Sequence, residues 1–409
     1  MDYTSTAPAR GRARRDLPGW LPLLLGFLTA VGPVSTDMYL PGFPAIEASL
    51  HGAPGSAQIT LATWFAGLAV GQITLGSLSD RFGRRLPLLA GTLLYTVASA
   101  GCALAPSLAA LSGWRAVAAI GGAASMVIPR AMVRDLADGH AAVRLMSRLI
   151  LVMGVAPILA PTLGGLLLGW GSWRMLFWTC TAYGALCALL VATLIPDTLP
   201  PAQRVRLGPT GLLARYIAIA RERGFITHAL MGGGGMFGMF AYISGSSTVY
   251  IRSFGITPAE YGMIFGLCAG GYIMASQVNA LLIARIGEDR ILAIAAATYL
   301  AATAVLCAVA FAGTTHLAAV VAPVFLSLAS MGFVMPNTTV GALSRHAAHA
   351  ASASALMGTM QFVLGALSGI LAGWLTDGTP RGMAVLMLTG ALVAAGAGMV
   401  RPRATAPRH

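Results

Sequence analysis

The amino-acid sequence predicts an all-α, polytopic membrane protein with twelve transmembrane helices arranged as two six-helix bundles. Hydrophobic residues make up 57% of its 409 residues and charged residues only 10%, whereas soluble domains carry about 25% charged residues. Apolar runs of about 20 residues, the length that spans a bilayer, recur along the whole chain. Because so few charged side chains are available to face water, we expect the lipid bilayer to surround most of this protein.

Twelve apolar runs are long enough to cross a membrane, and short polar connections separate most of them. The predicted spans are 18–40, 58–79, 86–106, 108–131, 145–169, 173–195, 225–249, 260–284, 290–312, 317–339, 354–376 and 382–400. An even number of spans places both termini on the same side of the membrane.

The arginines give the predicted orientation. All 26 basic residues are arginines, and with a cytoplasmic N-terminus 22 of them fall in cytoplasmic segments or helix ends. Arg174, Arg252 and Arg381 fall on the opposite side, and Arg115 lies inside a span. Cytoplasmic loops retain positive charge, so we expect both termini in the cytoplasm and the chain in a bacterial inner membrane. The net charge is +13. Because the arginines that produce it gather on the cytoplasmic side of the membrane, we expect no nucleic-acid partner.

The longest internal polar stretch divides the chain into two halves. A weak repeat supports the division, because the loop at 80–84 has a counterpart at 284–288, about half the chain length away. Two similar six-helix halves related by an axis along the membrane normal are a common transporter plan. The predicted organisation is a cytoplasmic tail at 1–17, a bundle at 18–195, a cytoplasmic linker at 196–224, a second bundle at 225–400 and a tail at 401–409.

The segment GSLSDRFGRR, residues 76–85, joins the second and third predicted spans. Its two glycines permit a tight turn and close helix approach, and its aspartate can pair with the arginines around it. Such a cluster could hold the cytoplasmic helix ends together in one state and release them in another, or it could be a topology signal without a gating role. The residues assigned to gating here are Gly76, Asp80, Arg81, Gly83, Arg84 and Arg85.

This segment resembles the signature between helices two and three of the major facilitator superfamily. Four further stretches make the chain similar to the bicyclomycin/chloramphenicol-resistance branch, Bcr/CflA, which contains twelve-helix drug:proton antiporters. They are STDMYLP at 35–41, RAMVRDL at 130–136, GVAPILAPTLGG at 154–165 and WRMLFW at 173–178. The resemblance implies the major facilitator fold, and it adds Asp135 at the exit of the fourth helix to the gating residues. In the second half it rests mainly on the helix pattern, Gln361 and Asp377.

Asp37 and Arg115 are charged residues inside predicted spans, where a charge is costly and marks a functional site by default. At about 1.5 Å rise per residue, both lie on the outer side of the midplane at similar depths. We therefore expect an ion pair that breaks when Asp37 takes up a proton, which would couple protonation to movement. The alternatives are an interfacial Asp37 and an Arg115 that reaches outward or forms a static bond. The resemblance supports the coupling role, because the family has an acidic residue and an arginine at the matching places.

The predicted fifth span contains prolines, which bend a helix, and glycines, which let a neighbour pack closely. The resemblance associates this pattern with antiporters rather than symporters, although Ala160 stands where the family usually has a glycine. The alternative is a kinked packing helix without a role in coupling. The residues concerned are Gly154, Pro157, Pro161, Gly164 and Gly165.

Six polar or aromatic residues within the spans are candidates to line a central substrate cavity. Aromatic side chains in such a cavity suit bulky, partly apolar molecules, but each of these residues could instead connect helices. The candidates are Tyr39, Trp64, Tyr242, Gln277, Asn279 and Gln361.

These features predict a proton-coupled antiporter that exports small drug-like molecules by alternating access, driven by the proton gradient and without another cofactor. No Gly-rich phosphate loop, metal-ligand cluster or nucleophile triad occurs in the sequence, so we expect no enzyme activity, no catalytic residue and no metal site. The alternatives are a major facilitator symporter, a metabolite or sugar exporter, and a membrane scaffold or sensor. A scaffold needs no charge inside a span, and the resemblance implies a monomer.

Overall fold

The computed structural model describes residues 20–136, 139–201, 204, 216–344, 350–375 and 377–402. The predicted tail at 1–17, most of the tail at 401–409, and residues 202–203 and 205–215 of the predicted linker lie outside this set. Throughout the described part of the chain the regular structure is helical, with no strand.

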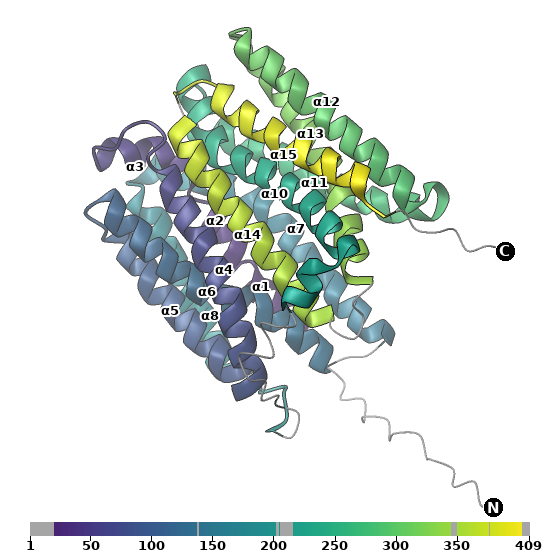
Figure 1. The fold of residues 1–409 in the computed structure, drawn as a ribbon. Helices are drawn as coiled ribbons and strands as arrows, with labels where there is room; N and C mark the ends of the chain where they lie inside the picture. Colours follow the sequence, from purple (N-terminus) through teal and green to yellow (C-terminus); the bar gives the residue numbers. More distant parts are fainter. Residues whose placement is uncertain are drawn as a thin grey trace, which may run out of the picture.

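The first half forms a bundle of long helices that run back and forth (Figure 1). Its first span is broken into pieces, because proline lacks a backbone donor and Pro33, Pro41 and Pro44 recur along it. The path continues as helix to Ser49, nine residues beyond the predicted end at 40. The elements are α1 (Leu21–Thr29), α2 (Val31–Asp37), η1 (Leu40–Gly42), α3 (Phe43–Ser49), α4 (Gln58–Phe82), α5 (Arg85–Ala103), α6 (Leu108–Leu136), α7 (Gly139–Trp170) and α8 (Arg174–Leu194).

The second half repeats the plan with six long helices. A short π-helix, η3, extends its first helix, and a capping box of Thr257 and Glu260 starts the next one. The elements are α10 (Arg223–Thr248), η3 (Val249–Ser253), α11 (Pro258–Ile286), α12 (Glu288–Phe311), α13 (Leu317–Ser344), α14 (Ala350–Leu375) and α15 (Arg381–Val400).

The helices are suited to a membrane. Ten helices among the described residues are long and apolar enough to cross one, and α7 contains a shorter apolar stretch, Val155–Trp170. The remaining long helix, α10, has 26 residues and is richer in Gly, Ser and Thr. Each of the twelve predicted spans coincides with one long helix or, for the first, with a chain of short ones. The prediction of an all-helical polytopic membrane protein is therefore confirmed.

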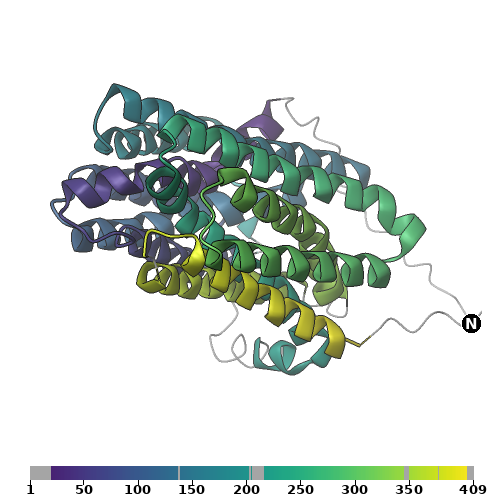
Figure 2. The ribbon, with the colours of Figure 1, turned by 90° about the horizontal axis from the view of Figure 1, so that it is seen from above.

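Two helix pairs form the seam between the halves, α4 with α14 and α7 with α11. The long helices run nearly parallel or antiparallel, as two perpendicular views show (Figures 1 and 2). Glycines allow the close approach, since a Cβ on Gly262 would lie 2.7 Å from the Cα of Thr162 on α7. Inside the second half, Gly234 of α10 and Gly390 of α15 pack backbone to backbone in the same way.

The chain itself distinguishes the two ends of the bundle. The described chain begins at Trp20 and ends at Pro402 at one end, which we call the near end (Figure 1). The opposite end, where α3 and η3 lie, is called the far end.

Candidate functional site

A buried arginine organises the near end of the first half. The Arg84 guanidinium donates to Asp80 at 2.5 Å from Nη1, to Asp135 at 2.8 Å from Nε and to the Ser79 hydroxyl at 3.0 Å. The Arg84 side chain is 8% exposed, and its backbone N–H donates to Asp197 at 2.8 Å. We call Arg84, Asp80 and Asp135 the near-end hub. All three members belong to the first half, so the hub ties α4, α5 and α6 together.

The other predicted gating residues surround this hub without joining it. Gly83 has a φ of +92°, which favours glycine, and its missing side chain leaves room for the Asp197 carboxylate. The Arg81 guanidinium lies over the Phe82 ring at 5.3 Å, and Arg85 donates to the carbonyl of Ala192. The space beside Gly76 is bordered by Val127 of α6. Only one of the three arginines in the segment therefore pairs with the carboxylates.

Replacing Arg84 by Gln is expected to destabilise the protein by about 3 kcal/mol, because two carboxylates lose a largely buried partner. The matched control is Arg81→Gln, which should change stability by no more than about 0.5 kcal/mol because Arg81 is exposed. Thermal unfolding of both purified variants measures the difference. Equal stability of the two would show that the hub contributes nothing.

The second half has a comparable cluster that the sequence repeat did not predict. Arg401, at the end of α15, pairs with Asp289 and Glu288 at the start of α12 and lies 3.4 Å from Nε2 of His228. In the first half the arginine precedes a helix, and an acid, Asp197, follows the last span. In the second half the acids start a helix, and the arginine follows the last span. A comparison of the two loops could not reveal Arg401, which lies more than a hundred residues away.

Arg115 is buried in an aromatic cage inside the first half. It is 2% exposed, and its guanidinium carbon lies 4.2 Å from the ring centre of Tyr39, 4.3 Å from Trp64 and 5.9 Å from Phe177. Nη1 donates to the carbonyl of Ser35 at 2.8 Å. Nε and Nη2 are buried without a hydrogen-bond partner among the described residues. Cation–π attraction thus provides much of the compensation for this charge.

Asp37 points away from this cage. Residues on a helix are about 100° apart, so Asp37 lies about 200° away from Tyr39, whose ring stacks on Arg115, and from Ser35, whose hydroxyl contacts that of Tyr95. The Asp37 side chain therefore faces the other side. There it lies near Tyr261 of α11, in the second half. Asp37 is 6% exposed, and within the described residues its carboxylate makes neither an ion pair nor a hydrogen bond. It is therefore a buried carboxylate at the seam without a counter-ion.

The expected ion pair between Asp37 and Arg115 is not formed among the described residues. Similar depth in the membrane was the basis for that expectation. The helical phase of α2, however, turns the Asp37 side chain away from the face that Arg115 contacts. Two residues named by the sequence nevertheless belong to one site, because Tyr39 and Trp64 form the cage around Arg115. Both are fully buried in this arrangement, and neither borders the cavity described below.

The remaining cavity candidates are scattered. Tyr242 stacks on Phe265 at 5.4 Å and has a buried hydroxyl without a partner in the described structure. Asn279 pairs its side-chain amide with Asn337 of α13, as helix-connecting residues do. Gln277 is exposed and Gln361 is half-buried. Sequence reasoning located them within spans but could not determine the faces on which they lie.

The fifth long helix, α7, joins the first half to the second. A Cβ on Gly164 would collide with the carbonyl of Met38, the residue after Asp37, and one on Gly165 would lie 2.5 Å from the carbonyl of Pro258. Pro157 and Pro161 lie inside the helix, and the latter borders Gly262 of α11. The surroundings of Gly154 lie outside the described side chains. Adjacent glycines on α7 thus face two different partners, the first span and the second half.

Gly165→Ala should destabilise the closed arrangement of the seam. The expected cost is about 1–3 kcal/mol, because a backbone carbonyl cannot easily move aside. Gly169→Ala is the matched control on the same helix, where an added Cβ meets nothing within 4 Å, and the helix gains up to about 1 kcal/mol. Thermal unfolding of both purified variants tests this. Equal stability of the two would show that the close contact is unimportant.

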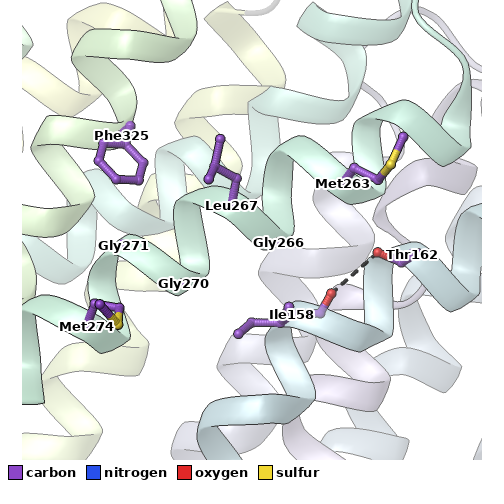
Figure 3. A pocket seen from close by; sticks show the side chains of 9 residues that line it. All are labelled: Ile158, Thr162, Met263, Gly266, Leu267, Gly270, Gly271, Met274 and Phe325. Carbon is purple, nitrogen blue, oxygen red and sulfur yellow. Dashed lines mark hydrogen bonds between the residues drawn. The ribbon is translucent and has the colours of Figure 1, made fainter.

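A cavity opens on the seam (Figure 3). It has a volume of about 690 Å³, and side chains from α7, α11 and α13 line it. The hydroxyl of Thr162 bonds to the carbonyl of Ile158 in its own helix, and the other side chains are apolar, including Met263, Leu267 and Phe325. The exposure of Met263 and Leu267, about 60% each, places this groove on the outer, lipid-facing surface of the bundle.

The family model of the Major Facilitator Superfamily matches residues 25–369. The chain belongs to the major facilitator superfamily. This superfamily contains transporters, so the chain is a multi-pass membrane transporter of small molecules and not an enzyme, as the sequence predicted.

Relatives within the superfamily support the drug:proton antiporter branch. The bicyclomycin resistance protein homolog of Haemophilus influenzae is 28% identical over 349 residues, which cover 85% of this chain and 87% of the relative. Multidrug resistance protein MdtL of Escherichia coli is 27% identical over 247 residues, covering 59% and 61%. The uncharacterized MFS-type transporter YdgK of Bacillus subtilis is 33% identical over 375 residues, covering 91% and 93%.

Solved structures of major facilitator transporters share the fold. A D-xylose-proton symporter superposes with a TM-score of 0.74 at 15% identity and covers 93% of this chain and 97% of its own. A bacterial homolog of the human lysosomal transporter Spinster, inward-facing and occupied, gives a TM-score of 0.73 at 15% identity, covering 93% and 95%. At this identity the likeness establishes the fold alone.

Proposed function

We propose that this transporter is a proton-coupled antiporter that exports drug-like small molecules by alternating access. One observation carries the proposal: Asp37 is a buried carboxylate with no counter-ion among the described residues, and it faces the opposite half of the molecule. Ionised carboxylates inside a membrane protein are costly unless they are paired, so proton uptake at Asp37 changes the free energy of closing the seam around it. The energy source is the proton gradient, with no other cofactor.

The substrate class is inferred from the relatives. Two of them are named for resistance to bicyclomycin or to several drugs, and we propose that this chain likewise handles drug-like molecules. The alternatives, a symporter or a metabolite or sugar exporter of the same superfamily, differ from it in the direction of transport or in the substrate.

The proposed cycle uses Asp37 as the proton carrier. Substrate enters the inward-open, deprotonated protein and competes with a proton. After the halves move and expose the site outward, protonation of Asp37 expels the substrate. Return of the protonated protein to the inward-open state then releases the proton to the cytoplasm.

We infer that the near end is cytoplasmic and that the protein is a monomer in the bacterial inner membrane. The three arginines predicted to lie outside, Arg174, Arg252 and Arg381, start α8, belong to η3 and start α15, which are far-end positions. The excess of arginine on the other side supports a cytoplasmic near end.

Drug accumulation in a pump-deficient bacterium tests the proposed function. Cells that express the chain should accumulate less of at least one compound from a chemically diverse drug panel, and a protonophore should abolish the difference. Increased accumulation would instead indicate uptake by symport. A reduction that persists with the protonophore would contradict proton coupling.

A further inference from the structure

An ion pair joins the two halves at the far end. Nη2 of Arg252, on η3, donates to Oε2 of Glu47, on α3, at 2.7 Å, although 205 residues separate them in the sequence. The Glu47 side chain is fully buried and that of Arg252 is 31% exposed. The ion pairs of Arg84, Arg204 and Arg401, by contrast, each stay within one half or its adjoining linker.

Glu47 is the fixed member of the pair. Its Oε1 accepts the backbone N–H of Ala57 at 3.1 Å, and its own carbonyl accepts the N–H of Gly52 at 2.8 Å. These bonds tie the carboxylate to the turn between α3 and α4. The same turn meets α14 of the second half, where a Cβ on Gly373 would lie 3.4 Å from the carbonyl of Gly55.

Arg252 is attached to the second half through a short π-helix. It lies on the π-helical turn that ends the first long helix of the second half, and such turns occur frequently at functional sites. The neighbouring Ser253 hydroxyl donates to the carbonyl of Gly378, between α14 and α15. A movement of the second half as a body would therefore carry Arg252 away from Glu47.

The closed arrangement of the far end requires both members of the pair. With the far end closed, Glu47 has no access to water, and a buried carboxylate without its partner is strongly unfavourable. With the far end open, both groups reach water, where an ion pair contributes little. A contact with such different values in two states shifts the equilibrium between them.

We propose that Glu47 and Arg252 form a far-end latch that holds the far end closed and breaks each time that end opens. This inference rests on the alternating-access part of the proposed function, and it assigns a role to two residues outside the proton and substrate sites. The pair could not be predicted from the sequence, because Glu47 fell in a predicted loop and Arg252 was only one of the outer arginines.

The distance between spin labels in the two halves tests the latch. Labels are placed at Leu104→Cys, at the far end of α5, and Thr315→Cys, in the exposed loop between α12 and α13, with the partly exposed Cys307 replaced by Ala. In lipid nanodiscs without substrate or gradient, Arg252→Gln should raise the ratio of long to short distances at least about fivefold, as expected for coupling between sites. Glu47→Gln should raise it less, because it leaves no uncompensated carboxylate.

Two further variants separate a latch from general damage. Arg252→Lys keeps the charge and should retain the closed population, and the neutral double variant of Glu47→Gln with Arg252→Gln should behave like Glu47→Gln alone. Arg381→Gln is the matched control, since Arg381 lies at the same end and contacts Phe311 within its own half. Unchanged distances in both single variants, or an equal shift in the Arg381 control, would overturn the latch.

The distance measurement requires neither substrate nor protons, so its outcome is independent of the proposed function. A latch that behaves as expected in a protein that exports no drug would refute the export proposal alone. If the protein exports drugs in a proton-driven way, but substitutions of Glu47 and Arg252 leave the label distances unchanged, the latch alone would be refuted.

Discussion

Asp37→Asn should abolish accumulation of substrate against its gradient while leaving the protein folded. The electrical part of the proton gradient supplies about 2.3 kcal/mol per charge per 100 mV, which corresponds to a concentration ratio of about 50-fold per proton. An asparagine cannot bind and release a proton, so the variant should equilibrate substrate to a ratio of about one. Substrate ratios across the membrane of intact cells, with and without a protonophore, measure this.

Asp377→Asn is the matched control for this experiment. Asp377 lies between α14 and α15, outside the spans, and the hydrogen bond from the Thr379 hydroxyl lowers its pKa. A carboxylate held ionised at an exposed position cannot carry protons near neutral pH, so this variant should export normally. Full export by Asp37→Asn would exclude Asp37 as the proton carrier, and equal loss in both variants would point to damage unrelated to proton binding.

Arg115→Met should end transport without unfolding the protein. Arg115 has no acidic partner among the described residues, so replacing it by an apolar side chain leaves no buried carboxylate uncompensated, and methionine can fill the space between Tyr39 and Trp64. The variant would lose the positive charge of the guanidinium beside the first span. Two nitrogens of this group have no hydrogen-bond partner among the described residues. We therefore expect unfolding free energy within about 1 kcal/mol of the wild type or higher, and export near background.

Arg174→Met is the control for cation–π stacking in general. Arg174 lies over Trp173 at 4.3 Å and donates to the carbonyl of Ala105, but it sits at the far end and outside the cage. Its variant should retain export. If Arg115→Met exported normally, the cage would be a packing feature; if it unfolded the protein, the charge would be required for the structure.

The helical spans could be predicted from sequence, because lipid imposes one length and one composition on every helix. The near-end hub was partly predictable: Asp80 and Arg84 are one helical turn apart, so their pairing is local. Asp135 entered only through the family resemblance, because nothing local in the sequence brings the end of α6 to the start of α5.

The candidate site was predicted residue by residue but not in its arrangement. Depth along a span follows from counting residues, whereas the facing direction follows from helical phase, and the phase separates Asp37 from Arg115. The spacing of Ser35, Asp37 and Tyr39 shows that Asp37 faces away from the other two. That separation could be used only once the neighbours of Ser35 and Tyr39 were known. The pairing of Glu47 with Arg252 depends on how the halves dock, which no local pattern encodes.

Proton movement during drug transport by the purified protein tests the central claim most directly. The protein is placed in liposomes that contain a pH-sensitive dye, with no initial pH gradient, and a substrate identified in cells is added outside. Antiport through Asp37 predicts proton efflux as the substrate enters, and no proton movement in Asp37→Asn. Substrate entry without proton movement, or with protons moving in the same direction, would contradict the account.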